Sequence, residues 1–267
     1  MTKLQIITPS APLHSGPTTD ASLDNEGLFG ETFKVTGTKN GFVFGSLIAD
    51  GYEGWIPKNC LGDLPVPNAW LLSPMTHVTL RASVKSPSCF SLSFRAVVNV
   101  INTKGDRAKI ATATGHAFLP RRHIQPHAEV KKKSSAENEL VDIDWVGFAE
   151  RIINAPYKWG GRTAWGLDCS ALVQLSLAAT GLDVPRDSGP QHEIGAHLDI
   201  ESPLSKSNLR RGDLVFWQGH VGIMQDHHRL LHANAYHMAV VSEPLEDAVA
   251  RISPIAGPIT ALRRPLF

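Results

Sequence analysis

The 267-residue sequence is poor in cysteine and contains no long apolar run. Its three cysteines, Cys60, Cys89 and Cys169, are odd in number and widely spaced, which argues against a disulfide framework and favours a reducing compartment. No CxxC pair or histidine cluster has the spacing of metal ligands. We therefore expect neither a metal nor another cofactor.

Net charge is also nearly absent, with 26 Lys and Arg against 25 Asp and Glu. Bulk electrostatics thus give no reason to expect a nucleic-acid or membrane partner. The first residues, MTKLQIITPSAPLHSGP, lack the apolar core and cleavage site of a signal peptide, and no later segment is long enough to span a membrane. The sequence predicts a cytoplasmic protein and leaves its oligomeric state open.

The N-terminal part, from Pro12 to about Ile124, consists of short β-rich pieces separated by turn residues. Asn40-Gly41 and Asp50-Gly51 are typical hairpin turns. The segment 51–61, GYEGWIPKNCL, aligns with 114–124, TGHAFLPRRHI, at an offset of 63 residues. With the flanking strand patterns, this repeat predicts two tandem β-barrels.

Composition predicts four parts. We expect a first barrel over residues 1–64, a second over 65–127, a linker over 128–141 and a larger domain over 142–267. Residues 65–74 resemble a linker at the start of the second part. In the larger domain, an amphipathic helix is expected over 142–155, capped by Asp142 or Asp144, and a closing strand in the apolar and basic tail, 254–267.

Cys169 is the leading candidate for chemistry. It follows Asp168 at the start of an apolar run that continues to Thr180 and stops at Gly181, which predicts a helix. A thiol on the first turn faces the positive end of the helix dipole, and this favours the nucleophilic thiolate. The alternative is that Cys169 is a small buried apolar residue, as most free cysteines are.

Two of the twelve histidines stand in a pattern that suits a general base. Residues 212–226 read as two strands joined at Gln218-Gly219, with His220 opening the second strand. Residues 230–243 read as another strand pair, with His232 and Asn234 on one face. Adjacent strands would place His220 beside His232, the arrangement that Cys/His nucleophilic catalysis needs.

The motifs DCSALVQ, PRDS, GDLVFW, GHVGI and LLHANA, in this order, resemble the NlpC-type peptidases, papain-like cysteine enzymes that cut bacterial cell-wall peptides. The resemblance covers about residue 145 to the C-terminus. It implies an α+β fold: a papain-like domain with helices packed on an antiparallel sheet, preceded by two small SH3-like β-barrels. It also implies Cys169 as nucleophile, His220 as general base and His232 as the residue that orients it. The usual glycine after Cys-Ser is replaced by Ala171.

The same resemblance implies substrate contacts near the nucleophile. Tyr157 corresponds to a tyrosine of the site, Asp168 and Ser170 to residues that hold the substrate's amine and backbone, and Ser188 to a contact on its carboxylate side. Each has a structural alternative: packing for Tyr157, as also for the nearby Trp159, the helix N-cap for Asp168 and a turn for Ser188. Asp213 reads as a turn residue or a buried structural acid.

The segment GYEGWIP resembles the closing strand of bacterial SH3-like domains, and two such domains before a peptidase resemble the dipeptidyl-peptidase branch of the family. In that branch the corresponding tyrosine, here Tyr52, closes the cleft, and an upstream acid binds the substrate's α-ammonium. Asp20 is the nearest match, with Asp24 and Glu26 as competitors. Tyr52 as a barrel core residue is the alternative. The second copy lacks the Tyr and Trp, so it is less suited to binding.

These observations predict a cysteine peptidase of cell-wall recycling that takes a small murein peptide. The expected substrate has a free L-Ala followed by γ-linked D-Glu and a diamino acid, and it is cut after the γ-D-glutamyl carbonyl. The sequence does not identify the diamino acid. Three alternatives stay open: a secreted endopeptidase that trims intact peptidoglycan, a non-catalytic module that binds wall fragments, and an acyltransferase.

Overall fold

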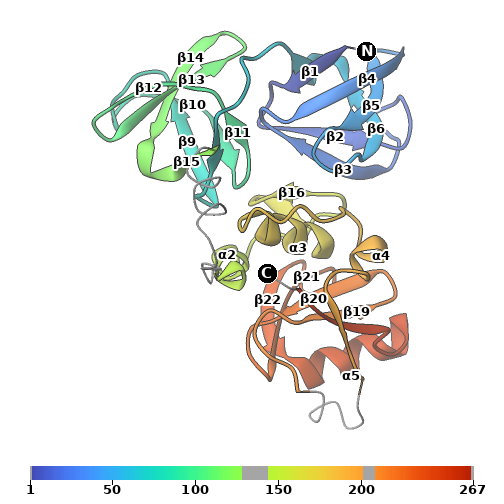
Figure 1. The fold of residues 1–267 in the computed structure, drawn as a ribbon. Coiled ribbons are helices and arrows are strands. Elements are labelled where there is room, and N and C mark those ends of the chain that lie inside the picture. The colour runs from blue at the N-terminus through green and yellow to red at the C-terminus, as the bar shows by residue number, and fades with distance from the viewer. Residues whose placement is uncertain (1, 128–143, 201–207, 266–267) are drawn as a thin grey trace. The chain divides into compact units, whose positions relative to one another are not determined.

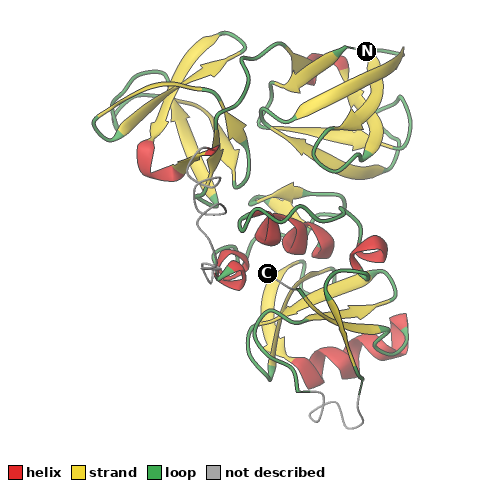
Figure 2. Cartoon of the chain, in the orientation of Figure 1, coloured by secondary structure: helices red, strands yellow, loops and turns green. Residues whose placement is uncertain are grey.

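The computed structural model describes residues 2–127, 144–200 and 208–265 (Figure 1). The chain divides into two compact units: Met1–Val141 with Trp159–Trp165, and Asp142–Lys158 with Gly166–Phe267. Strands build most of the first unit, and helices accompany a sheet in the second, so the predicted α+β class is confirmed (Figure 2). The expected linker 128–141 lies outside the described residues. No helix in the described ranges is both long and apolar enough to cross a membrane.

The first β domain is one seven-stranded antiparallel sheet in the order β3-β2-β6-β5-β4-β1-β7. Asn40 and Gly41 form its predicted tight turn, both with positive φ, at 50° and 79°. Phe33 and Ile56 are fully buried in its core. Its strands are β1 Lys3–Ile6, β2 Ser10–His14, β3 Leu23–Leu28, β4 Thr32–Lys39, β5 Phe42–Leu47, β6 Glu53–Pro57 and β7 Leu61–Gly62.

The second β domain has two antiparallel sheets, ordered β10-β9-β14-β13-β12 and β11-β8-β15. Its strands are β8 Ala69–Leu71, β9 Met75–Thr79, β10 Ser88–Ser93, β11 Val97–Val98, β12 Val100–Lys104, β13 Arg107–Thr112, β14 Gly115–Pro120 and β15 Ile124–Pro126. The 3₁₀ turns η1 Lys58–Cys60 and η2 Arg121–His123 end the closing strands of the two domains at the predicted 63-residue offset.

Interpreting residues 65–74 as a linker was wrong. Within this stretch β8 pairs with both β11 and β15, and Leu71 is fully buried. The prolines on either side of β8 gave it the composition of a connector, but its alternating burial is that of a strand packed on a core.

A segment of the predicted peptidase domain, Trp159–Trp165, belongs to the N-terminal unit. Arg162 is buried there and forms a two-bond ion pair with Glu31, with nitrogen-oxygen distances of 3.0 and 3.1 Å. Its backbone N–H also donates to Glu26, at 3.0 Å. Two short strands pair here: β16 Arg162–Thr163 lies within the segment, and β17 Gly166–Leu167 follows it.

The C-terminal unit is a six-stranded antiparallel sheet in the order β18-β23-β19-β20-β21-β22. Helix α3 packs on β20 and β21 (Figure 1). The strands are β18 Ala196–Leu198, β19 Leu214–Trp217, β20 His220–Met224, β21 Arg229–Asn234, β22 Ala239–Pro244 and β23 Ala261–Arg264. The helices are α2 Trp145–Glu150, α3 Cys169–Ala178, α4 Ser188–Gln191 and α5 Leu245–Ala256.

Two expectations for this unit need correction. The helix expected over 142–155 is regular only over Trp145–Glu150, because the backbone then tightens to i,i−3 hydrogen bonds and reaches positive φ at Asn154. Asp144 caps it. The strand expected in the tail 254–267 is present as β23, but it is confined to Ala261–Arg264, and the start of the tail is the end of α5. Pro254 lies inside that helix and gave a misleading boundary.

Candidate active site

Cys169 is the first residue of α3, as predicted. Asp168 caps the helix, its carboxylate accepting from the Ala171 N–H at 2.9 Å. The backbone N–H groups of Val221 and Ser170 act to lower the pKa of the Cys169 thiol. Helix α3 packs on β20, the strand that carries the candidate base His220.

The prediction that Cys169 rests as a thiolate is contradicted. Burial raises the pKa of the thiol to about 12, and the neighbouring Asp168 carboxylate also raises it, while the Val221 and Ser170 N–H groups and Arg186 act in the opposite direction. The residue is only 7% exposed. Loss of hydration at this site outweighs the helix N-terminus, so the resting group is the thiol.

His220 and His232 lie side by side on β20 and β21, as the strand pattern predicted. His220 Nε2 and His232 Nδ1 are 2.8 Å apart, and the two ring centroids are 5.0 Å apart. Burial lowers the pKa of His220 to about 3, and repulsion from His232 and Arg251 lowers it as well. His220 is therefore neutral at neutral pH and able to accept a proton.

Glu243, which the sequence analysis did not predict as a site residue, is the third member of this hydrogen-bonded series. Glu243 Oε1 is 2.6 Å from His232 Nε2, and Arg251 forms an ion pair with the same carboxylate. Burial alone would raise the pKa of Glu243, but the His232 hydrogen bond and the charge of Arg251 hold it below its usual range. Glu243 follows by two residues the position on β22 that faces His232, a register that only the strand pairing reveals.

These contacts assign the histidine tautomers. Ionised Glu243 accepts from His232 Nε2–H, so His232 Nδ1 must accept from His220 Nε2–H. His220 Nδ1 is then the unprotonated nitrogen. The array is set to take one proton at that atom and to stabilise the imidazolium that results.

The start of α3 is held by a buried cation that was also missed as a site residue. Arg186, 3% exposed, donates to both Asp168 carboxylate oxygens, at 2.9 and 2.5 Å, and to Ser170 Oγ at 2.8 Å. Gln191 of α4 donates to the Ser170 carbonyl at 2.9 Å. The PRDS motif contains Arg186, so the signal was present in the quoted sequence.

The predicted substrate contacts fall in both units. Tyr157 is half-buried, and burial together with the charge of Asp168 raises its pKa to about 12, so it keeps its phenolic proton. Asp168 and Ser170 are buried around Arg186, and Ser188 opens α4. Tyr52 packs against the core of the first β domain. Asp20 is exposed on that domain. Their roles toward a substrate stay predictions.

Two further expectations concern neighbouring residues. Asp213 is a buried structural acid, one of the two predicted alternatives, and accepts two hydrogen bonds from Arg264 at 2.7 Å. Trp159, expected to pack, is 65% exposed.

Comparison with known proteins agrees with this geometry. Residues 154–252 match the model of the NlpC/P60 family, and residues 13–61 match that of the bacterial dipeptidyl-peptidase SH3 domain. The resemblance found in the sequence is confirmed. The second β domain corresponds to the first by the internal repeat described above.

Relatives extend over most of the chain. A gamma-D-glutamyl-L-lysine dipeptidyl-peptidase of Bacillus subtilis is 25% identical over 80% of this chain and 70% of its own length. A protein of the same name from Bacillus cereus is 29% identical, and the match covers 61% of its length, less than two thirds. Dipeptidyl-peptidase 6 of Lysinibacillus sphaericus is 25% identical over 86% of both chains.

One solved structure shares the fold over the whole length. The crystal structure of an NlpC/P60 family protein from Bacillus cereus covers 100% of both chains with a TM-score of 0.78 and 20% sequence identity. The architecture of β domains followed by a helix-and-sheet domain is thus common to both proteins.

Proposed function

Since residues 154–252 form a cysteine peptidase domain of the NlpC/P60 family and residues 13–61 a bacterial dipeptidyl-peptidase SH3 domain, we propose that this chain is a γ-D-glutamyl-diamino acid peptidase. Its substrate is a small murein peptide with a free N-terminal L-Ala. It cuts between the γ-D-glutamyl carbonyl and the diamino acid. The reaction serves the recycling of cell-wall fragments.

The observation that carries the proposal is the hydrogen-bonded array of His220, His232 and Glu243, with Cys169 at the start of the helix that packs on the strand of His220. In this mechanism His220 Nδ1 takes the thiol proton as the sulfur attacks the γ-carbonyl. The carbonyl oxygen becomes an oxyanion near the start of α3, where the positive end of the helix dipole stabilises it. His220 then gives the proton to the leaving amine, which departs as the free diamino acid.

Hydrolysis completes the cycle. Water loses a proton to His220 Nδ1 and attacks the thioester, the second tetrahedral intermediate collapses, and the sulfur leaves and regains the proton. The products are L-Ala-D-Glu, with a new γ-carboxylate, and the diamino acid. Throughout, Glu243 stays ionised and stabilises the imidazolium through His232.

Specificity for a free amine rests on the first β domain. An ammonium that leaves water needs a paired negative charge, and a wall limits the peptide to one residue before the D-Glu. Tyr52 is our candidate for the wall. Asp20, exposed on that domain, is our candidate acid. Of its competitors, Glu26 is buried and accepts from the backbone of Arg162, whereas Asp24 is half-buried near the surface.

The relatives support the substrate class. Two are named gamma-D-glutamyl-L-lysine dipeptidyl-peptidases, and that name describes release of a dipeptide at a γ-D-glutamyl bond. We place the reaction in the cytoplasm, which suits a chain whose three cysteines are all unpaired. Cell fractionation with an antibody to the protein tests this placement, and recovery from the medium or the wall would contradict it.

The substrate proposal is tested with L-Ala-γ-D-Glu-diaminopimelate, its N-acetylated form and intact sacculi. We expect cleavage of the free peptide, with a lower kcat/KM for the N-acetylated form, since that form cannot make the ammonium–carboxylate pair. Equal cleavage of both peptides would contradict the free-amine requirement. Release of fragments from sacculi would favour an endopeptidase of intact peptidoglycan.

A further inference from the structure

Although the whole chain is nearly neutral, its two β domains carry formal net charges of opposite sign. Residues 65–127 contain eight lysine and arginine residues and a single acid, Asp106, a formal net charge of +7. Residues 1–64 contain four basic and seven acidic residues, a formal net charge of −3. A small domain with this excess of cations attracts anionic ligands and repels cationic ones.

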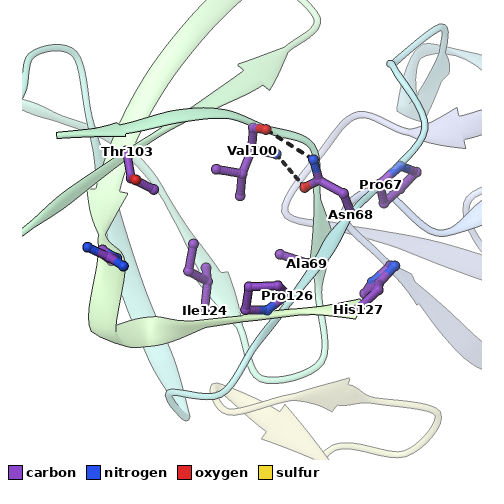
Figure 3. A pocket seen from close by; sticks show the side chains of 9 residues that line it. Pro67, Asn68, Ala69, Val100, Thr103, Ile124, Pro126 and His127 are labelled. Carbon is purple, nitrogen blue, oxygen red and sulfur yellow. Dashed lines mark hydrogen bonds between the residues drawn. The ribbon is translucent and has the colours of Figure 1, made fainter. Parts of the chain in front are cut away.

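The two β domains also differ in one strand, which is continuous in the first domain and divided in the second. In the first domain β4 is one continuous eight-residue strand that pairs with β1. In the second, the corresponding stretch is divided into β11 and β12, which belong to different sheets. At the division the Asn68 side chain replaces the backbone ladder, accepting from Val100 N–H at 2.8 Å and donating to Val100 C=O at 3.0 Å (Figure 3).

A pocket of about 700 Å³ lies at this division. Figure 3 shows its apolar lining from Val100 on β12 and from Ile124 and Pro126 on β15. Both β12 and β15 are edge strands of their sheets. An edge strand offers backbone donors and acceptors to an added extended segment, and the volume is that of a site for a small ligand and not for a polymer.

Arg121 is the charged group of this pocket. Its side chain is exposed, and within residues 2–127, 144–200 and 208–265 no hydrogen bond or ion pair engages its guanidinium. The adjacent Arg122 is equally exposed but does not line the pocket. An arginine at the edge of an apolar hollow suits a carboxylate, which it can bind with two parallel hydrogen bonds.

We propose that the second β domain binds a short, extended, carboxylate-bearing peptide in the pocket between β12 and β15, with a carboxylate on Arg121. Apolar parts of the peptide lie against Val100 and Ile124. The site holds its ligand without cleaving it, and it does not depend on the proposed peptidase reaction. It differs from the expectation drawn from the sequence that the second copy, lacking the Tyr and Trp, is the less suited to binding.

The test uses the full chain carrying Cys169→Ala and the probe N-acetyl-L-Ala-γ-D-Glu-L-Lys. The blocked amine and the missing sulfur separate this binding from the proposed catalysis. Backbone amide chemical shifts locate the ligand, and their titration gives the Kd. We expect saturable shifts at Val100, Thr103 and Ile124.

Matched variants test the chemistry. Arg121→Gln should weaken binding roughly tenfold, the worth of one charge-assisted contact, whereas Arg122→Gln should change it by less than about twofold. Amidation of both probe carboxylates should weaken binding as Arg121→Gln does. Absence of shifts at the pocket, or equal losses in the two arginine variants, would overturn the proposal. So would tighter binding of inorganic polyphosphate with equal dependence on both arginines, which would indicate a general polyanion surface.

Discussion

At the scale of single residues, the candidate site works against the ionisation that its chemistry requires. Burial holds Cys169 as a thiol and His220 as a neutral imidazole, with pKa values of about 12 and 3. Charge separation must therefore come with substrate, as the sulfur attacks and the imidazolium gains the support of Glu243 through His232. Placing Cys169 at a helix start was predictable, but its degree of burial was not, because that depends on strands more than 40 residues away.

The raised pKa of Cys169 predicts how this residue and the exposed Cys89 react with iodoacetamide. Cys89 is exposed and should be alkylated first at pH 7.5, while Cys169 should react slowly in the absence of substrate. Because its pKa is raised to about 12, the labelling rate of Cys169 should keep increasing with pH above 9, where an ordinary thiol levels off. Peptide mass spectrometry measures each site. Faster labelling of Cys169 than of Cys89 at pH 7.5 would show a resting thiolate.

Glu243 gives a second prediction at this scale. Glu243→Gln keeps the shape of the side chain but removes the charge that stabilises the imidazolium, so kcat should fall roughly 10- to 100-fold. KM should change little, since Glu243 contacts His232 and Arg251. The exposed Glu246→Gln on α5 is the matched control and should retain full activity. A large rise in KM with unchanged kcat would contradict the positioning role.

At the scale of elements, the start of α3 depends on the loop that precedes α4. Arg186 compensates the Asp168 charge in a buried setting, with side chains 1% and 9% exposed. Removing one partner of such a pair leaves an unpaired buried charge, whereas removing both does not. This asymmetry makes the role of the pair measurable.

Arg186→Met should lower the free energy of unfolding of the C-terminal unit by about 3–5 kcal/mol, measured by urea denaturation. Adding Asp168→Asn should restore much of this loss, because asparagine still caps the helix while the unpaired charge is gone. The single variant Asp168→Asn removes the carboxylate partner of Arg186. It is the control and should also be destabilised. Additive losses in the double variant would contradict a coupled ion pair.

Sequence patterns predicted elements well where periodicity and turn signals agreed. The hairpin of β19 and β20 around Gln218-Gly219 and the pair β21 and β22 lie where they were expected. Prolines led to two wrong predictions. Those on either side of β8 suggested a linker, and Pro254 suggested a boundary where α5 continues. Glu243 and Arg186 were missed because their partners are set by strand register and loop packing, which local patterns do not encode.

At the scale of the whole molecule, the chain joins a cysteine peptidase domain to two β domains of opposite charge. One short segment of the peptidase sequence, Trp159–Trp165, is built into the N-terminal unit through Arg162 and Glu31. The peptidase residues proposed for chemistry all lie in the C-terminal unit. Of the residues predicted to contact the free amine, Tyr52 and Asp20 belong to the N-terminal unit, whereas Asp168 and Ser170 belong to the C-terminal one.

The most direct measurement is product analysis by mass spectrometry after incubation of L-Ala-γ-D-Glu-diaminopimelate with the full chain and with its Cys169→Ala variant. The account predicts L-Ala-D-Glu and free diaminopimelate from the full chain, and a rate at least about 10³-fold lower from the variant. Cleavage at another bond, or undiminished cleavage by Cys169→Ala, would contradict it.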